Sequence, residues 1–442
     1  MKQILRPLQN QWRRRPRRPK PPMFSKISPL CSSDGASLLH FCRGLILFII
    51  AGLTCFSACG QKFDNLALTP PMGWNSWNKF GNAVNEELIR ETADAMVASG
   101  MKDAGYEFIN IDDTWEGERD GQGFIQPDPQ KFPSGMKALA DYVHSKGLKL
   151  GIYSDAGALT CGGKPGSRGH EYQDALTYAQ WGIDYLKCDW CGCEDLNAKG
   201  AYTTMRDALH AAGRPVVFSI CEWGNSKPWE WAGTVGHLWR TTGDIYPSFD
   251  SKLDHGTWYQ WGVLPILDLQ EGLRKYAGPG RWNDPDMLEV GNGMTATEDR
   301  AHFSMWCMLA APLISGNDLR HMSKETAEIL LNKDVIAVDQ DKLGIEGFRY
   351  SADGLLEVWF KPLVDGKWAM CVLNRSPRPQ KVRFDWKAEK VSDDLSKRAT
   401  RFDTTLYSVH DLWTKKELGT TEDILNADLP EHDVLMMRLD KR

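Results

Sequence analysis

The chain has 442 residues, of which 42% are hydrophobic and 25% charged, and its formal net charge at pH 7 is -5. This composition excludes a disordered protein, and the length favours one large domain with a smaller one. Residues 1–58 carry ten Lys or Arg and one Asp, so the remainder has 43 basic and 57 acidic residues, a net charge of -14. Such a surface excludes nucleic acid and anionic membrane as natural partners and favours a neutral substrate.

The first 58 residues are typical of a signal or leader segment. Leu45–Ala58 is an uncharged, mostly apolar run that is too short for an ordinary membrane-spanning helix, and Arg43 precedes it. The run ends in Phe56–Gly60, which resembles a bacterial lipoprotein signal in which Cys59 becomes the lipidated first residue. A simple signal peptide cut nearby is the alternative. We therefore expect an exported protein, either a periplasmic or outer-membrane lipoprotein or a secreted protein.

From Met72 onward, short apolar strands alternate with amphipathic helices. Strands are expected at Met72–Trp77, Glu107–Asp112, Leu148–Asp155, Gly182–Cys191, Pro215–Glu222, Leu238–Asp244, Arg281–Leu288 and Leu313–Ser315. Helices are expected at Asn85–Ala104, Met136–Lys146, Tyr172–Trp181, Ala198–Ala212, Pro228–Ala232, Glu298–Ala311 and Lys324–Leu331, with a helical region from about Ser251 to Tyr276. Eight such units predict an α/β fold, a closed (β/α)8 TIM barrel over residues 66–344. A doubly wound open sheet is the alternative, although no Gly-rich dinucleotide loop supports it.

The sequence pattern changes beyond Gly344. Short apolar stretches such as Leu355–Phe360, Trp368–Leu373 and Val382–Phe384 are separated by turns, which is typical of antiparallel strands. The sequence therefore predicts a C-terminal antiparallel β-sandwich over residues 345–442, without a catalytic constellation of its own.

The stretch Gly182–Cys191 joins a buried strand to charged side chains. Lys187 and Asp189 are two residues apart and project from the same face of an extended chain. A cation beside a carboxylate keeps that carboxylate ionised. Asp189 is therefore a candidate nucleophile, and a metal ligand or half of a buried ion pair are the alternatives.

Carboxylates recur at the carboxyl ends of the other predicted strands, where barrel enzymes place their chemistry. The candidates at this rim are Trp77, Asp112, Asp113, Tyr153, Asp155, Lys187, Asp189, Glu222, Arg240, Asp244, Asp284 and Asp286. Capping of the following helix also explains an Asp such as Asp155. Carboxylates and Trp together suit a neutral polyhydroxylated ligand, whereas a metal site would favour His, and His237 is the only one near.

Seven cysteines follow Cys59. Cys161, Cys188, Cys191 and Cys193 allow a zinc site, but export to an oxidising compartment favours a disulfide. We expect Cys161 to pair with Cys191, although the sequence alone leaves the connectivity open.

Two carboxyl groups flanking a scissile bond are the requirement for glycoside hydrolysis. Asp189 beside Lys187 has the surroundings of an ionised nucleophile, and Asp244, in a Gly-containing loop, is the candidate acid that protonates the leaving oxygen.

Seven motifs occur in a fixed order along the chain: Pro71–Trp77, Ile111–Trp115, Gly151–Asp155, Lys187–Asp189, Cys221–Gly224, Trp239–Asp244 and Trp282–Met287. As a set they resemble the α-galactosidases of glycoside hydrolase family 27, from about Leu66 to the C-terminus. The resemblance implies a retaining exo-α-galactosidase with Asp189 as nucleophile and Asp244 as acid/base. It implies no metal and no organic cofactor.

The resemblance also assigns the contacts to a terminal galactose. It places Asp112 and Asp113 at the O4 and O6 hydroxyls and Lys187 toward O3 and O4. Arg240 and Glu222 surround O2, Trp77 and Tyr153 form apolar walls, and Asp286 belongs to the last binding motif.

Glu222 bears on the closest alternatives within the family. An α-N-acetylgalactosaminidase needs small side chains where Glu222 stands, so galactose is favoured, and a β-L-arabinopyranosidase is the other alternative. The chain departs from animal relatives at Thr114, where they carry Cys, at Gly236, where they carry the partner of Cys221, and at Asn225, which replaces a bulky apolar residue.

A non-catalytic galactoside-binding protein is the hypothesis from another class. The presence of both Asp189 and Asp244 argues against it, because a binding module has no use for the pair. The expected partner is a galactose-containing glycan, a membrane enters only through the lipid anchor at Cys59, and the sequence leaves the oligomeric state open.

Overall fold

The computed structural model describes residues 61–442 of the chain. The predicted leader and Cys59 lie outside the described residues. No helix within the described part is both long enough and apolar enough to cross a membrane.

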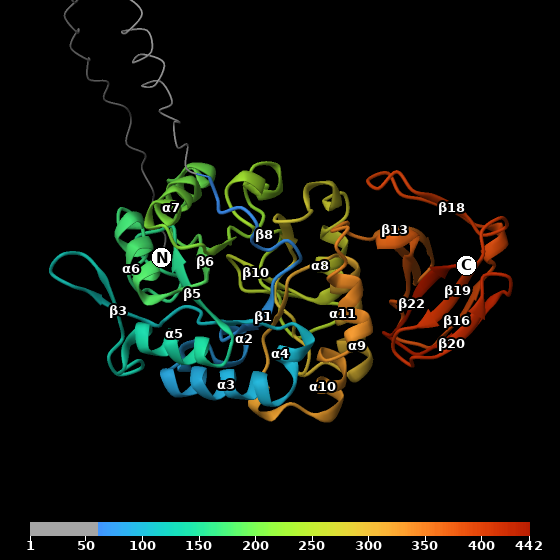
Figure 1. The fold of residues 1–442 in the computed structure, drawn as a ribbon, viewed down its shortest axis with the longest axis horizontal. Coiled ribbons are helices and arrows are strands. Elements are labelled where there is room, and N and C mark those ends of the chain that lie inside the picture. The colour runs from blue at the N-terminus through green and yellow to red at the C-terminus, as the bar shows by residue number, and fades with distance from the viewer. Residues whose placement is uncertain (1–60) are drawn as a thin grey trace, which may run out of the picture. The chain divides into compact units, whose positions relative to one another are not determined.

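Eight parallel strands form one sheet, in the order β11-β8-β7-β6-β5-β2-β1-β12. Figure 1 labels β1, β5, β6 and β8 of this sheet. They are β1 (Met72–Asn75), β2 (Phe108–Asn110), β5 (Lys149–Asp155), β6 (Tyr185–Asp189), β7 (Val217–Ile220), β8 (Leu238–Arg240), β11 (Trp282–Asp284) and β12 (Leu313–Ser315). The sheet closes through Leu288, whose N–H donates to the carbonyl of Ile314 at 2.8 Å and whose carbonyl accepts from Gly316 at 3.0 Å. The predicted (β/α)8 barrel is confirmed.

Helices of the barrel follow the strands, although the predicted helix Asn85–Ala104 is divided at Gly100, which has φ +87°. They are α2 (Trp77–Phe80), α3 (Glu86–Ala98), α4 (Met101–Ala104), α5 (Gly135–Ser145), α6 (Glu171–Trp181), α7 (Ala198–Ala212), α8 (Val263–Leu269), α9 (Ala296–Met308), α10 (Lys324–Leu330) and α11 (Lys333–Asp339). Side-chain caps fix the starts of α3, α7, α9, α10 and α11. Asn85 accepts from the N–H of Leu88 at the start of α3, and Thr295 and Glu298 form a capping box at the start of α9.

Two predicted helical segments are not α-helical over their whole length. Pro228–Ala232 folds as two short 3-10 turns, η2 (Pro228–Glu230) and η3 (Ala232–Thr234). The chain from Ser251 to Gly262 forms a hairpin of β9 (Lys252–Asp254) and β10 (Tyr259–Trp261) before α8 begins. Gly256 lies in the turn of this hairpin at φ +86°, and its N–H donates to the side chain of Asp254. This local hydrogen bonding competes with helix formation. A second hairpin, β3 (Glu116–Arg119) with β4 (Ile125–Pro127), follows β2.

The C-terminal domain is antiparallel, as predicted. Its main sheet has the order β13-β14-β15-β22-β19-β20, and the pairs β16 with β21 and β17 with β18 complete it. These strands are β13 (Phe348–Asp353), β14 (Leu356–Pro362), β15 (Trp368–Asn374), β16 (Gln380–Phe384), β17 (Lys390–Ser392), β18 (Ala399–Arg401), β19 (Tyr407–Asp411), β20 (Glu417–Thr420), β21 (Leu425–Leu429) and β22 (Val434–Lys441). An aromatic core fills it, including Phe360, Trp368, Phe384, Trp386 and Phe402.

The two domains share buried contacts. Lys361 on β14 donates to the carbonyl of Cys307 on α9 at 2.8 Å, and Glu346 accepts from Asn283 on β11 at 3.0 Å. Barrel and sandwich therefore pack as one compact unit.

The barrel interior changes from apolar to charged toward the carboxyl ends of the strands. Phe108, Tyr185, Leu238 and Trp282 form an apolar layer. Two residues later, on the same face of each of these strands, stand Asn110, Lys187, Arg240 and Asp284. Gly151 makes room for this second layer, because a Cβ there would clash with Oδ1 of Asn110. The strand alternation thus delivers charged groups to the rim.

Candidate active site

Asp189 ends β6 and is almost enclosed, with 6% of its surface exposed. The hydroxyl of Tyr153 donates to Oδ2 at 3.0 Å, and the N–H of Trp190 donates to Oδ1 at 3.0 Å. Burial raises the pKa of Asp189 to about 6; Lys187 opposes this shift, and the charge of Asp244 adds to it. The carboxylate is therefore ionised at neutral pH, and each of its oxygens is held by a donor.

Lys187 crosses the barrel interior from β6 to Asp112. Its Nζ lies 2.9 Å from Oδ2 of Asp112 and 5.3 Å from the centre of the Tyr153 ring. Burial opposes the charge on Lys187, but Asp112, Cys221 and Asp189 together raise its pKa well above the ordinary value. Lys187 is thus a fixed cation.

Asp112 and Asp113 lie just beyond β2. Oδ2 of Asp112 also accepts from Asn75 at 2.7 Å, and Oδ1 accepts from the N–H of Asp113 at 2.9 Å. Asp113 accepts from the N–H groups of Thr114 and Gly162, both at 2.6 Å. Burial raises the pKa of Asp113. The two neighbouring carboxylates are held by different elements and keep fixed orientations.

Arg240 ends β8 and connects two more acids. Its Nη2 lies 2.7 Å from Oδ2 of Asp286 and 3.0 Å from Oδ1 of Asp244. Asp286 also accepts from the N–H groups of Ile245 and Met287, both at 2.8 Å, and it adopts φ +85°, which is uncommon for a residue with a side chain. The side chain of Asp244 is 40% exposed. Asp286 therefore holds Arg240 and the Asp244 loop, while Asp244 faces solvent.

Glu222 stands apart from this network. It has no solvent-exposed surface, and Oε2 accepts from the N–H of Ser226 at 2.6 Å within the same loop. Oε1 has no hydrogen-bond partner among residues 61–442, and burial raises the pKa of Glu222 to about 7. The predicted contact of Glu222 with a sugar hydroxyl stays a prediction.

The two predicted apolar walls differ. Trp77, the first residue of α2, is half-buried, and its N–H donates to Oδ1 of Asn75 at 2.8 Å. Tyr153 is buried, and its hydroxyl, rather than its ring alone, contacts the site.

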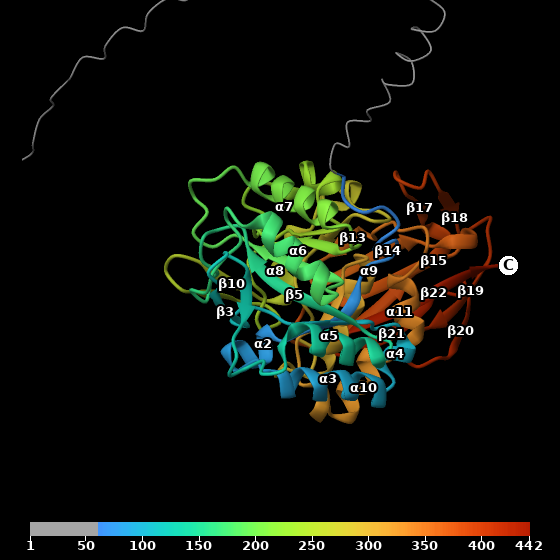
Figure 2. The ribbon, with the colours of Figure 1, turned by 60° about the vertical axis from the view of Figure 1, so that its left-hand side comes forward.

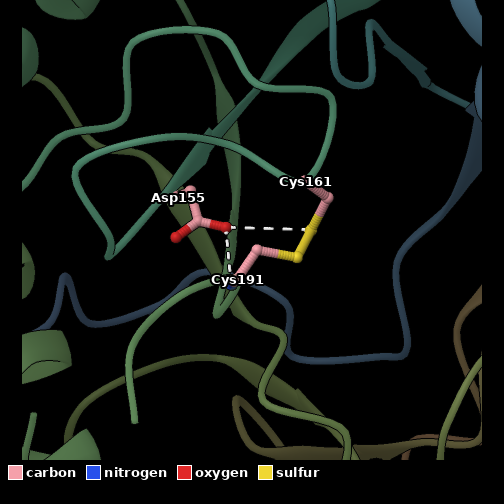
Figure 3. A group of neighbouring side chains, drawn as sticks. All are labelled: Asp155, Cys161 and Cys191. Atoms are coloured by element: carbon pink, nitrogen blue, oxygen red, sulfur yellow. Dashed lines mark hydrogen bonds between the residues drawn. A yellow bond between two sulfur atoms is a disulfide. The ribbon is translucent and has the colours of Figure 1, made fainter. Parts of the chain in front are cut away.

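Cys161 and Cys191 form a disulfide beside the rim. Figure 3 shows Asp155 at the end of β5 facing this bond, with Oδ2 accepting from the N–H of Cys191 at 2.8 Å. Asp155 and the two sulfur atoms lie close enough together to resemble a metal site, but sulfurs joined to each other are not thiolate ligands. Asp155 also accepts from Gly157 at 2.6 Å, and burial raises its pKa to about 7. Through these two hydrogen bonds Asp155 holds the loop after β5 and the loop after β6.

Sequence reasoning missed one buried contributor, Asn75, which orients Asp112. The rim candidate Asp284 lies in the charged interior layer, where burial raises its pKa to about 6 and Arg240 opposes the shift. The alternation of polar residues on β1 and β11 carried this signal, because Asn75 and Asp284 stand two residues beyond Gly73 and Trp282.

The rim contains one enclosed carboxylate, Asp189, which is held by hydrogen-bond donors, and one exposed carboxylate, Asp244. It also contains two cations, Lys187 and Arg240, and the acid pair of Asp112 and Asp113. An enclosed carboxylate suits attack on a carbon centre, and an exposed acid is accessible to both a leaving group and water. Together they suit a two-step substitution at a neutral substrate.

Known families match both domains. The family model described as "Alpha galactosidase A" matches residues 69–341, and that described as "Alpha galactosidase C-terminal beta sandwich domain" matches residues 353–439.

Individual proteins match over nearly the same range. The α-galactosidase A of Cellvibrio japonicus is 60% identical over 394 residues, which cover 89% of this chain and 97% of that protein. The structure of α-galactosidase I from Mortierella vinacea is 38% identical with a TM-score of 0.79, covering 85% of this chain and 98% of the other. The structure of the Saccharomyces cerevisiae α-galactosidase with raffinose is 30% identical, also with a TM-score of 0.79, and covers 85% and 98%.

Proposed function

The chain belongs to the α-galactosidases of glycoside hydrolase family 27, and from this membership we propose how its own residues release galactose. The enzyme hydrolyses terminal α-D-galactosyl residues from oligosaccharides or polysaccharide side chains, with Asp189 as nucleophile and Asp244 as acid/base. The observation that carries the assignment is the contrast between the two acids: Asp189 is enclosed and held by Tyr153, whereas Asp244 is 40% exposed.

Catalysis proceeds by double displacement. A carboxylate oxygen of Asp189 attacks the anomeric carbon, the bond from that carbon to the leaving oxygen breaks, and Asp244 gives its proton to the leaving oxygen. Asp244 then takes a proton from water, whose oxygen attacks the same carbon and breaks the ester to Asp189. Two inversions return galactose with its original configuration, and Asp244 regains its proton.

The charged side chains that are held in fixed positions select galactose. Asp112 and Asp113 accept from the O4 and O6 hydroxyls, since their orientations are already set by Asn75, Lys187 and Gly162. Lys187 has protons left for O3 and O4, Arg240 lies toward O2, and the Trp77 ring supplies an apolar wall. Asp286 holds Arg240 in place through an ion pair of 2.7 Å.

We also propose that the protein is exported and anchored through a lipid on Cys59. The apolar run Leu45–Ala58 supports export, and the Cys161–Cys191 disulfide is typical of an oxidising compartment. Mass spectrometry of the N-terminal peptide from the expressed full chain tests the lipid. A Cys59→Ala variant that stays in the membrane fraction would rule the anchor out.

The enzymatic proposal is tested by assaying the chain from Gln61 onward on p-nitrophenyl α-galactoside, the α-N-acetylgalactosaminide and the β-L-arabinopyranoside. We expect preference for the galactoside, loss of turnover in Asp189→Ala, and normal activity in Asp103→Ala, an exposed Asp on α4. Another preferred glycoside, with turnover still lost in Asp189→Ala, would keep the mechanism and change the sugar. Galactose binding without turnover would favour a binding protein.

A further inference from the structure

The hairpin of β9 and β10 presents apolar side chains to solvent. Trp258 is 47% exposed, Tyr259 39% and Leu253 42%, and they lie within seven residues of one another. In Figure 2 the yellow-green segment that carries β10 extends at the left of the molecule, on the side where β3 and α2 are labelled. Exposed aromatic side chains gathered on one loop mark a contact surface.

This hairpin is bonded directly to the loop of the proposed acid/base. The N–H of Trp261 donates to the carbonyl of Asp244 at 2.8 Å, and the carbonyl of Trp261 accepts from Tyr246 at 3.1 Å. The Trp261 indole covers Gly243, since a Cβ there would lie 2.9 Å from its Nε1. The aromatic surface therefore begins at Asp244 and continues outward along β10.

The rings on the hairpin are held in fixed positions. Tyr259 and Trp261 share one face of β10, and Nζ of Lys252 lies 3.3 Å and 4.3 Å from the centres of their rings. On the turn, the ring of His255 stacks on Trp258 with centroids 4.0 Å apart and an interplanar angle of 13°. A ligand would meet a preorganised surface, so binding would lose little side-chain entropy.

We infer that this hairpin binds the leaving part of the substrate, the sugar units on the reducing side of the scissile bond. The inference rests on the proposed function, because Asp244 must lie beside the oxygen that it protonates, and the leaving sugars continue from that oxygen. Aromatic faces pack against sugar C–H surfaces, while Lys252, on the same face as Tyr259 and Trp261, supplies donors for hydroxyls. One Lys and one Asp on the two strands leave the surface without excess charge, which suits a neutral glycan.

The experiment compares two substrates that differ only in the leaving group. Raffinose leaves sucrose, whereas α-galactosyl fluoride leaves fluoride, which has nothing for the hairpin to contact. For Trp258→Ala and Tyr259→Ala, the ratio of kcat/KM on raffinose to kcat/KM on the fluoride should fall roughly 3- to 10-fold. Tyr259→Phe keeps the ring and should keep most of the ratio. Leu355→Ala, which removes an equally exposed apolar side chain from the sandwich, should leave it unchanged.

Three results would overturn the inference. An unchanged ratio in both alanine variants means that the leaving sugar does not touch the hairpin, and a simultaneous change in oligomeric state would assign the surface to a second copy of the chain. An equal loss on raffinose and on methyl α-galactoside, whose leaving oxygen also needs the proton of Asp244 but carries no sugar, means that the hairpin only supports the Asp244 loop. A wild-type enzyme that turns over neither galactoside would refute the proposed function, and this inference with it.

Discussion

The hydroxyl of Tyr153 on β5 donates a 3.0 Å hydrogen bond to Oδ2 of Asp189 on the neighbouring strand β6. A hydroxyl that donates to a carboxylate stabilises the ionised form over the protonated form. Burial acts in the opposite direction and raises the pKa of Asp189, so the reactivity of this carboxylate depends on a balance of named contacts.

The pH dependence of the wild-type enzyme should show an acidic limb near pH 6. Asp189 must be ionised to attack, and its pKa is about 6, so kcat/KM is high above this pH and falls about tenfold per unit below it. The measurement is kcat/KM on α-galactosyl fluoride from pH 4 to 8. A limb near pH 4 would mean that burial does not control this carboxylate, or that another group limits the rate.

Tyr153→Phe should lower kcat/KM by roughly tenfold or more and move the acidic limb to higher pH. The variant keeps the ring but removes a hydrogen bond to a charged group, a contact that contributes about 1.5–3 kcal/mol. Tyr142→Phe is the matched control, since its hydroxyl donates to Asp94 on the outside of the barrel at 2.7 Å. Equal losses in both variants, or a limb that does not move, would contradict a role for Tyr153 in holding the carboxylate.

Azide should distinguish the two proposed acids. In Asp244→Ala the galactosyl ester of Asp189 still forms from α-galactosyl fluoride, and azide attack on it gives the α-galactosyl azide. In Asp189→Ala azide attacks the substrate directly, with one inversion, and gives the β-galactosyl azide. Without azide, turnover should fall on the order of 10²- to 10⁴-fold in Asp244→Ala, which lacks the general acid/base, and further in Asp189→Ala, which lacks the nucleophile. NMR of the products decides, and the same anomer from both variants would refute the assignment.

The strand ends of the barrel were predictable because two local signals coincide there. Apolar runs of strand length locate β5 and β6, and the acids that follow them cannot remain in the apolar interior. The candidates Asp112, Lys187 and Asp189 followed from this pattern alone.

Contacts between loops were less predictable, because they depend on geometry across the barrel. The position of Glu222 is set by the Ser226 N–H that closes its loop, and the hairpin after Asp244 is set by Gly256 and by pairing between Lys252 and Trp261. The sequence pattern predicted a helical region from about Ser251, but the α-helix begins only at Val263. The residues before it form the hairpin, because local turn bonding there is stronger than the helical tendency.

Removal of the Cys161–Cys191 disulfide should lower the free energy of unfolding by about 3–4 kcal/mol, because the bond closes a loop with a sequence separation of 30. It should also lower activity, since Oδ2 of Asp155 holds the N–H of Cys191 close to β6. Urea unfolding of the Cys161→Ala, Cys191→Ala double variant measures the first effect. Reductant should bring the wild type to the stability of the double variant and leave that variant unchanged; insensitivity of the wild type would show that the bond does not form.

The stability of the enzyme should fall as the pH rises from 5 to 8, and Glu346 between the two domains should cause part of the fall. Burial raises the pKa of Glu346 from its ordinary 4.5 to about 7, with Asn283 and Lys361 opposing the shift. Between these values the folded protein keeps a proton that the unfolded chain releases, so the contribution of Glu346 is complete below pH 4.5 and is lost as the pH approaches 7 and passes it.

Glu346→Gln should reduce this pH dependence. The amide is isosteric and never ionises, so the variant gains stability relative to the wild type as the pH rises, by an amount on the order of 3 kcal/mol across the window. The slope should not vanish, because burial also raises the pKa values of Asp339, Glu289 and Asp299. Urea unfolding at pH 5, 6, 7 and 8 measures the difference, with the exposed Glu328→Gln on α10 as control. Parallel curves for Glu346→Gln and the wild type would mean that Glu346 is ionised in the folded protein throughout, held by Lys361 and Arg274.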